Sequence, residues 1–85
     1  MNVGRQYFSL CMSPEFIYVL GGYNKELSVL SSCERFSLIA KKWEIVDDLA
    51  IPRMNASACF VDQNVYIFGG LGKNGFLDSI ERFNT

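Results

Sequence analysis

Two short apolar runs, each closed by a pair of glycines, constrain what this chain can fold into. Residues 16–22 read FIYVLGG and residues 64–70 read NVYIFGG, and aligning Gly21 with Gly69 gives an offset of 48 residues. Each run is rich in β-branched and aromatic residues and has the length of a strand rather than of a helix. Because its apolar residues are consecutive, we expect both faces of each strand to be covered. The glycine pair permits positive φ, or lets another backbone approach closely.

The similarity extends beyond these two runs. At the same offset Arg5 corresponds to Arg53. After the glycine pair the offset becomes 47, and residues 34–36 (ERF) correspond to residues 81–83 (ERF). The loop after the glycines has gained or lost one residue while the flanking strands kept their register, since loops tolerate length changes better than strands. The chain therefore contains two copies of one structural unit.

The sequence predicts strands and turns. No stretch holds a helical period over about eleven residues; residues 27–39 come closest, but four serines interrupt the apolar pattern. The short connections carry Gly, Asn, Asp, Ser or Pro, as turns require. We expect strands over about residues 7–12, 16–22, 32–37 and 42–46 in the first unit, and over about residues 56–61, 64–70 and 79–84 in the second.

The order of the other recurring residues resembles a known repeat. A strand ending in Gly-Gly is followed by Glu34, Phe36 and Trp43, and Arg53 comes after a proline-containing loop. This order resembles the kelch repeat, whose period is about 50 residues, and the resemblance covers nearly the whole chain. In that family each repeat forms one four-stranded antiparallel blade of a β-propeller, with its first strand nearest the axis. The motif positions in this chain are Gly21, Gly22, Glu34, Phe36, Trp43, Arg53, Gly69, Gly70, Glu81 and Phe83.

The resemblance implies an all-β fold made of incomplete propeller blades. We expect one full blade in residues 1–52, and three strands of a second blade, lacking its fourth strand, in residues 53–85. Propellers close with about four to eight blades, so the remaining blades are expected partners. The chain is then a segment of a longer kelch protein, a truncated product or a fragment that assembles. Since the outer faces of two blades stay open, we expect the isolated chain to associate, aggregate or remain partly unfolded.

Composition argues against several classes of partner. The net charge is −1, which does not suit a surface for nucleic acid or anionic lipid. No apolar stretch approaches the roughly 20 residues of a membrane-spanning helix, and the first residues do not read as a signal peptide. The three cysteines lack the spacing of a zinc site or of a disulfide framework. We therefore expect a cytoplasmic protein with reduced thiols, no nucleic-acid partner and no membrane partner.

The usual residues of a catalytic or metal centre are missing from the sequence. It contains no histidine, the commonest general base and a common metal ligand. Asp47, Asp48 and Asp62 are predicted to be solvated loop residues. Residues 70–75 have the spacing of a dinucleotide-binding loop, but residues 76–81 read as a strand where that site needs a helix. We expect no catalytic residue, no bound metal and no cofactor.

One enzymatic alternative follows from the resemblance. Some kelch propellers are oxidases similar to galactose oxidase, whose copper site uses tyrosine and histidine. The chain would then be a non-catalytic fragment of such an enzyme. Flanking blades that carry histidine, or a secretion signal, would favour this alternative, whereas a flanking BTB domain or F-box would favour an adaptor.

Charges that recur with the period are interpreted as structural. Arg5 and Arg53 each have an acidic counterpart in their own unit, Glu34 and Glu81. Their recurrence predicts internal ion pairs or braces for the backbone, and the alternative is that they face a partner. This interpretation also agrees with the kelch resemblance.

Recurring aromatic and sulfur-containing residues are likewise assigned to the interior. Tyr18, Tyr66 and Trp43 are predicted to fill the space between blades rather than to stack on a ligand. Cys11 and Cys59 occupy equivalent positions in the first strands. Packed sheets lie about 10 Å apart and a disulfide needs Cα atoms within about 7 Å, so both are predicted to be buried free thiols.

Loops on a rigid scaffold are the expected place for function. On a propeller, one face collects the loops between second and third strands and those between blades, here residues 23–26, 71–76 and 48–54. Their mixture of aromatic, amide and charged side chains suits a protein or peptide partner. The leading hypothesis is therefore a protein-interaction module, and the resemblance implies a substrate receptor of a ubiquitin ligase or a cytoskeletal adaptor. The candidate partner-binding residues are Tyr23, Asn24, Lys25, Lys73, Asn74 and Phe76.

Overall fold

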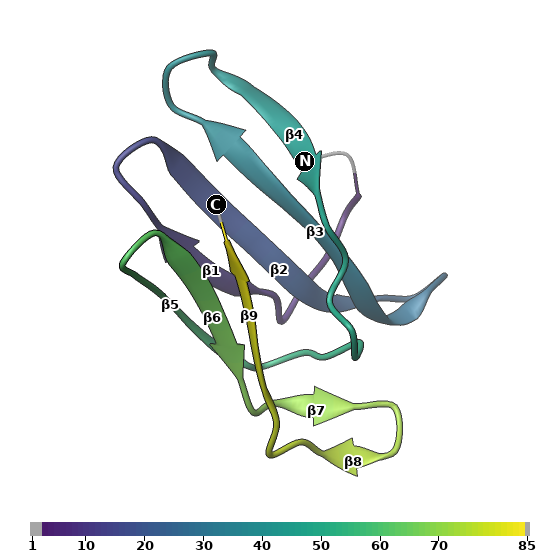
Figure 1. Cartoon of the computed structure of the whole chain (residues 1–85). Helices are drawn as coiled ribbons and strands as arrows, with labels where there is room; N and C mark the ends of the chain where they lie inside the picture. Colours follow the sequence, from purple (N-terminus) through teal and green to yellow (C-terminus); the bar gives the residue numbers. More distant parts are fainter. Residues whose placement is uncertain (1–2, 85) are drawn as a thin grey trace.

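The chain folds into two antiparallel sheets that pack against each other (Figure 1). The computed structural model describes residues 3–84. Sheet one has the strand order β1-β2-β3-β4, sheet two has the order β5-β6-β9, and β7 pairs with β8 in a separate hairpin. The strands are β1 (Ser9–Met12), β2 (Phe16–Asn24), β3 (Ser28–Ser37), β4 (Lys42–Val46), β5 (Ser57–Val61), β6 (Asn64–Phe68), β7 (Leu71–Gly72), β8 (Gly75–Phe76) and β9 (Ile80–Asn84).

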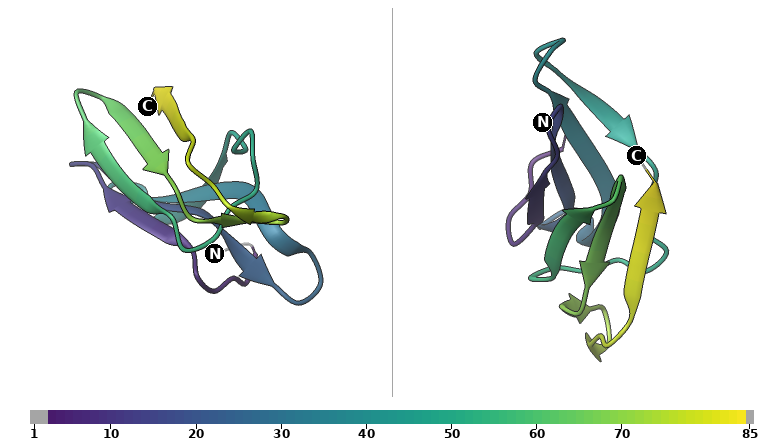
Figure 2. Two further views of the ribbon diagram at one scale, coloured as in Figure 1. Left: turned by 90° about the horizontal axis from the view of Figure 1, so that it is seen from below. Right: turned by 60° about the vertical axis from the view of Figure 1, so that its left-hand side comes forward.

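This arrangement confirms the predicted all-β class. Sheet one supplies four antiparallel strands and sheet two supplies three, as expected for one kelch blade and part of a second. The first strands of the two units, β1 and β5, lie side by side (Figure 2). No helix in residues 3–84 is long and apolar enough to cross a membrane. The division of the chain after residue 52 stays a prediction, and its outer bounds at residues 1 and 85 lie outside the described residues.

The strand bounds differ from prediction mainly around the glycine pairs. In sheet one, β2 continues past Gly22 to Asn24, so β3 begins at Ser28, and the register shifts between Leu20 and Gly22. The predicted loop at residues 23–26 is therefore partly strand.

In the second unit the strand ends earlier, at Phe68, and the predicted loop contains the small hairpin β7–β8. The strand β5 also starts slightly later than predicted, at Ser57. In both units the backbone beyond the glycine pair bonds to the segment before the unit's first strand, at Gln6 with Tyr23 and at Met54 with Leu71. Residues predicted to form loops are paired there for this reason.

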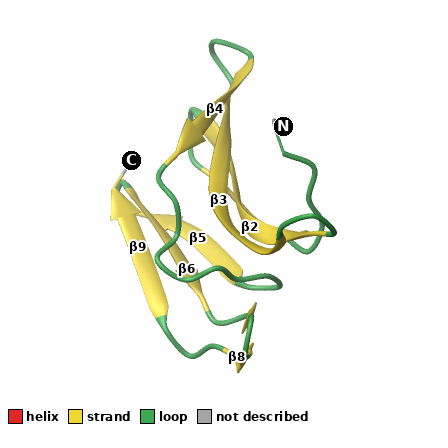
Figure 3. Cartoon of the chain, turned by 90° about the vertical axis from the view of Figure 1, so that its right-hand side faces the viewer, coloured by secondary structure: helices red, strands yellow, loops and turns green. Residues whose placement is uncertain are grey.

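The core lies between the two sheets (Figure 3). Tyr18 and Leu20 of β2 point toward sheet two and pack with Val65 and Ile67 of β6. Each such buried side chain contributes about 1.5–3 kcal/mol. Val19, between them in sequence, points to the other face of sheet one and is also buried. The strand β2 is therefore covered on both faces, as its consecutive apolar residues predict. The same expectation is wrong for β6, whose outward face leaves Phe68 41% exposed.

Arg53 connects the two sheets. Its backbone bonds to sheet one, because its carbonyl accepts from Gly22 N (2.9 Å) and its N–H donates to Leu30 O (3.1 Å). Its buried guanidinium bonds to the second unit, donating to the Gly69 carbonyl at 3.2 Å, to both oxygens of Ser79 and to Glu81 at 2.9 Å. A planar guanidinium with several fixed donors is the side chain suited to this arrangement.

Arg5 repeats this set of side-chain contacts in the first unit. Its guanidinium donates to the Gly21 carbonyl at 2.8 Å, to both oxygens of Ser32 and to Glu34 at 3.0 Å. The side chains of Arg5 and Glu34 are almost completely buried. The internal ion pairs predicted from the period therefore exist in both units.

The glycine pairs leave space for other backbone segments that pass close to them. All four glycines have positive φ, as predicted for at least one glycine of each pair. A Cβ on Gly22 would lie 2.8 Å from the Gln6 carbonyl and 3.1 Å from Phe8 Cβ, and one on Gly21 would collide with the Arg53 carbonyl. A side chain at either position would push the incoming strand away from the sheet.

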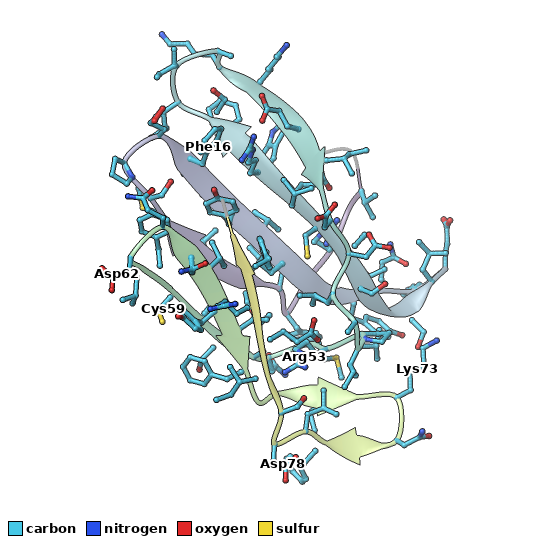
Figure 4. The ribbon with its side chains drawn as sticks, viewed as in Figure 1. Phe16, Arg53, Cys59, Asp62, Lys73 and Asp78 are labelled. Carbon is cyan, nitrogen blue, oxygen red and sulfur yellow. The ribbon has the colours of Figure 1, made fainter. Side chains whose placement is uncertain are left out.

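The three cysteines are free, and two of them are buried. Burial raises the pKa of the Cys11 thiol and that of the Cys33 thiol to about 11. Cys59 is only partly buried, so the prediction of a buried thiol is wrong for this residue. It lies on the side of sheet two that faces away from sheet one, where no described residue covers it fully (Figure 4).

The recurring aromatic residues occupy three different environments. Tyr18 is buried between the sheets, with its ring edge-on to Phe83 at 6.4 Å. Trp43 packs edge-on against Phe36 at 5.3 Å, within sheet one. Tyr66 is half-buried on the outward side of sheet two. Only Tyr18 therefore lies between the two described sheets.

Replacing Arg53 by Met is expected to destabilise the protein strongly. Met fills a similar volume but lacks the guanidinium, so the Glu81 carboxylate and the carbonyls of Gly69 and Ser79 each lose a charged donor. Breaking a buried ion pair in this way costs about 3–5 kcal/mol. Urea unfolding at a fixed chain concentration measures the loss.

The matched control for this change is Glu44→Gln. Arg35 and Glu44 form an ion pair of similar length, 2.7 Å, but both side chains are partly exposed. Such pairs contribute about 0–1 kcal/mol. An equal loss of stability in the two variants would contradict the bracing role of Arg53.

Adding a single methyl group at Gly22 is expected to destabilise more than the same change at Gly75. Both residues have positive φ, +106 and +127, but a Cβ on Gly75 meets nothing within 4 Å. The difference between Gly22→Ala and Gly75→Ala in urea unfolding therefore isolates the steric contact with the strand segment at Gln6. We expect it to exceed about 1 kcal/mol. Equal effects would show that φ alone sets the requirement for glycine.

Thiol modification at pH 8 in dilute solution is expected to label Cys59 first. The thiolate is the reactive form, and Cys11 and Cys33 are buried and stay protonated well above pH 8. They should react only after unfolding in urea. Native labelling of Cys33 as fast as that of Cys59 would contradict the fold of the core.

The same two thiols make stability depend on pH in the alkaline range. Their pKa is about 11 in the folded state against 9.0 without burial. Below about pH 9 both states keep the protons, and between about pH 9 and 11 the unfolded state releases them first. The free energy of unfolding is therefore expected to fall as pH rises through this window.

Candidate functional site

The loops predicted to bind a partner gather at one end of the two sheets (Figure 1). The β2–β3 turn at residues 25–27 and the β7–β8 turn at residues 73–74 both project there, beside the connection from β4 to β5. The opposite end carries the turn between β3 and β4, whose Leu38 and Ile39 are exposed. One end of the molecule therefore presents most of the candidate residues.

A hollow of about 270 Å³ lies at this end in the second unit. Ile51 and Pro52 of the connection between the sheets form one side of it, and residues 72–77 form the other. Phe76 is 93% exposed. Lys73, at the turn of the β7–β8 hairpin (Figure 4), is the only charged residue among those that line the hollow. The hollow thus combines apolar side chains with one cation, and it lacks any acidic group.

A corresponding hollow of about 430 Å³ exists in the first unit, with different lining. Val3 and Gly4 correspond in position to Ile51 and Pro52, and the β2–β3 turn takes the place of β7–β8. Here Glu26 lies beside Lys25, so the charges of the lining balance. The lining of the hollow in the second unit therefore has a net positive charge, whereas the lining of the hollow in the first unit is neutral overall.

The six candidate residues divide into two groups. Lys25, Lys73, Asn74 and Phe76 are exposed at turns or at the hairpin edge. Tyr23 and Asn24, predicted in a loop, belong to β2.

The side chain of Asn24 is already hydrogen-bonded within the protein. Its amide donates to the Gly4 carbonyl at 3.1 Å and its side-chain oxygen accepts from Leu27 N at 2.7 Å. Such a short polar side chain closing its own turn is a common structural use of asparagine. Tyr23 pairs its backbone with Gln6 in both directions. We therefore give these two residues a supporting position and keep the exposed group as the candidate contact.

Sequence reasoning missed the hairpin and the two apolar residues on the facing side of the hollow. Residues 72–75 read GKNG, a two-residue turn between glycines, which is a signal for a tight hairpin. Ile51 and Pro52 carry no comparable signal, because only the path of the connection between the sheets brings them to the hairpin.

No catalytic arrangement is visible in the described part of the chain. Residues 3–84 contain no group of three His, Cys, Asp or Glu side chains placed to hold a metal ion. Asp47, Asp48 and Asp62 are exposed, as predicted. The glycine-rich stretch 70–75 leads into β8 rather than into a helix, as predicted.

Comparison with known proteins identifies the repeat. The kelch motif matches residues 4–50 and again residues 52–85. The chain is 31% identical over its whole length to kelch repeat and BTB domain-containing protein 2 of cowpox virus (strain GRI-90), covering 15% of that protein. It is 30% identical over 86% of its length to an F-box/kelch-repeat protein of Arabidopsis thaliana, covering 16% of that protein.

A third similar protein is kelch repeat protein C2 of vaccinia virus (strain Western Reserve), at 30% identity over 82% of this chain and 14% of that protein. The chain thus spans about a sixth of the length of these curated relatives or less. Two matched repeats, two sheets of the expected topology and the duplicated Arg–Glu brace lead to one assignment. This chain belongs to the kelch motif family.

Proposed function

We propose that the chain is a cytoplasmic protein-interaction module that binds a protein partner through the loop end described above. The observation that carries this proposal is the hollow between the β7–β8 hairpin and the connection between the sheets, with Phe76 beside it almost fully exposed. An exposed aromatic side chain next to an apolar recess and one cation is typical of a binding contact.

The relatives support a role in recognition. Their names combine kelch repeats with a BTB domain in one protein and with an F-box in another, and they name no reaction. By analogy, the repeats of this chain would recognise the protein that a ubiquitin ligase acts on. A cytoskeletal adaptor is the other role that the kelch resemblance implies. The missing histidine gives no support to an oxidase similar to galactose oxidase.

A selection from a displayed peptide library tests this proposal. Peptides that bind the wild-type protein are compared with the double variant Lys73→Glu, Phe76→Ser. Loss of a central apolar contact and reversal of the charge should weaken binding by about tenfold or more. Selected peptides should also carry an acidic residue near an apolar one, since Lys73 is the only charge of the recess.

The control is the double variant Lys41→Glu, Ile39→Ser in the turn between β3 and β4. This turn also carries a lysine and a large apolar residue, is exposed and lies at the opposite end (Figure 1). Binding should remain at the wild-type level in the control. Peptides that lose binding equally in both variants, or in neither, would contradict the proposed loop end.

A further inference from the structure

The outward side of sheet two repeats a surface that is buried in sheet one. We define the trailing face as Cys59 of β5, Phe68 of β6 and Ile80 of β9, which point away from sheet one. At the repeat offsets these residues correspond to Cys11, Leu20 and Cys33. Leu20 and Cys33 are 0% exposed because sheet two covers them, whereas Phe68 is 41% exposed and Ile80 is 67% exposed.

The outward side of sheet one is the matching half of that contact. We define the leading face as Leu10 and Met12 of β1, which are 55% and 60% exposed. They correspond to Ala58 and Phe60 of β5, which pack against the core between the sheets. The two surfaces that pack against each other between sheet one and sheet two are thus each repeated once on the outside of the molecule.

The backbone shows the same relation. In sheet one, the N–H of Gly22 and the carbonyl of Leu30 bond to the backbone of Arg53 as it enters from the second unit. Their counterparts in the second unit are Gly70 N–H and the Leu77 carbonyl, and neither has a hydrogen-bond partner among residues 3–84.

The space beside these two groups is open. A Cβ on Gly21 would collide with the Arg53 carbonyl, whereas a Cβ on Gly69 would meet nothing closer than the Leu77 carbonyl at 3.9 Å. The second unit therefore has the two backbone groups and the open space that receive the Arg53 backbone in the first unit, but no described residue occupies them. Arg5 corresponds to Arg53 at the repeat offset, and its backbone N–H and carbonyl have no partner in the described residues.

We propose that a second copy of this chain docks on the trailing face through its leading face. In the docked pair, β1 of the second copy lies on β5, with Leu10 and Met12 on the trailing face, as β5 lies on β1 within one chain. Sheet one of the second copy then covers Phe68 and Ile80. The backbone of Arg5 of the second copy bonds to Gly70 N–H and to the Leu77 carbonyl. This contact repeats the interface between the two sheets of one chain. The leading face of a second copy therefore already carries the residues that the trailing face needs.

The proposed contact joins two different surfaces, so each chain keeps one free surface of each kind at its two ends. Contacts of this head-to-tail type form closed rings when the rotation closes and open arrays when it does not. A ring of kelch-type units holds about four to eight blades. Two units per chain then correspond to about two to four chains in a closed ring.

Two variants distinguish this contact from any other self-association. Ile80→Lys places a charge on the trailing face, and Met12→Lys places one on the leading face; both positions are well exposed in the single chain. Each variant keeps one intact face, and neither can pair with itself. An equimolar mixture can pair the trailing face of Met12→Lys with the leading face of Ile80→Lys.

Sedimentation velocity gives the expected and the contradicting results. Wild type should form species larger than a monomer, each variant alone should be monomeric, and the mixture should give a defined dimer. Restored pairing in the mixture also shows that both variants are folded. The control Ile39→Lys, equally apolar and exposed but in the β3–β4 turn, should assemble like wild type. A monomeric wild type, a variant that still dimerises alone, or a mixture without dimer would overturn the proposal.

Cys59 provides a second measurement, because it lies on the trailing face. Its modification rate in wild type should fall about tenfold when about nine-tenths of the chains are assembled. In Ile80→Lys the rate should not change with concentration. Equal rates at low and high concentration in an assembled wild type would also overturn the proposal, because the contact would then leave the trailing face open.

Discussion

A buried arginine whose backbone belongs to one sheet and whose side chain belongs to the next is the interaction on which the structure depends. Arg53 satisfies Gly22 and Leu30 of sheet one with its own peptide groups, and its guanidinium reaches three residues of the second unit. A charge removed from water is tolerated where it is paired and hydrogen-bonded, and both terminal nitrogens of the Arg53 guanidinium are bonded in this way. The brace therefore specifies how one unit follows the next, and the apolar core between the sheets supplies most of the stabilisation.

The glycine pair and the arginine act as one device. The Arg53 carbonyl occupies the space next to Gly21 that a side chain would need, and Gly21 in turn offers its carbonyl to Arg5. Glu81 adds a further link, since it accepts from Ala50 N at 2.6 Å and from Ile51 N at 3.1 Å in the connection. The glycine pair, the arginine and the glutamate recur together in both units because each forms its contacts with the others.

The period of the sequence predicted these features because each depends on residue types at fixed spacing. The offset of 48 paired the arginines, and the offset of 47 paired their glutamates. The length of β2 was not predictable in this way, since it depends on backbone pairing with the segment at Gln6. The hairpin β7–β8 had a local turn signal in residues 72–75, which the comparison of the two units did not use. The exposure of Cys59 was missed for a related reason. A position equivalent to a buried one is buried only where a neighbouring sheet covers it.

The two units are most alike where they bond to each other and least alike where the chain turns outward. Val29 and Phe76 are equivalent positions in the two ladders, paired with Tyr23 and Leu71 respectively. Val29 is buried, whereas Phe76 is almost fully exposed. The shared brace requires no such difference, and an exposed phenylalanine adds nothing to folding. The strands and the Arg–Glu brace are duplicated, whereas the turns are not, so each unit can present different side chains on the same scaffold. Recognition would then depend on the residues that differ between the two units.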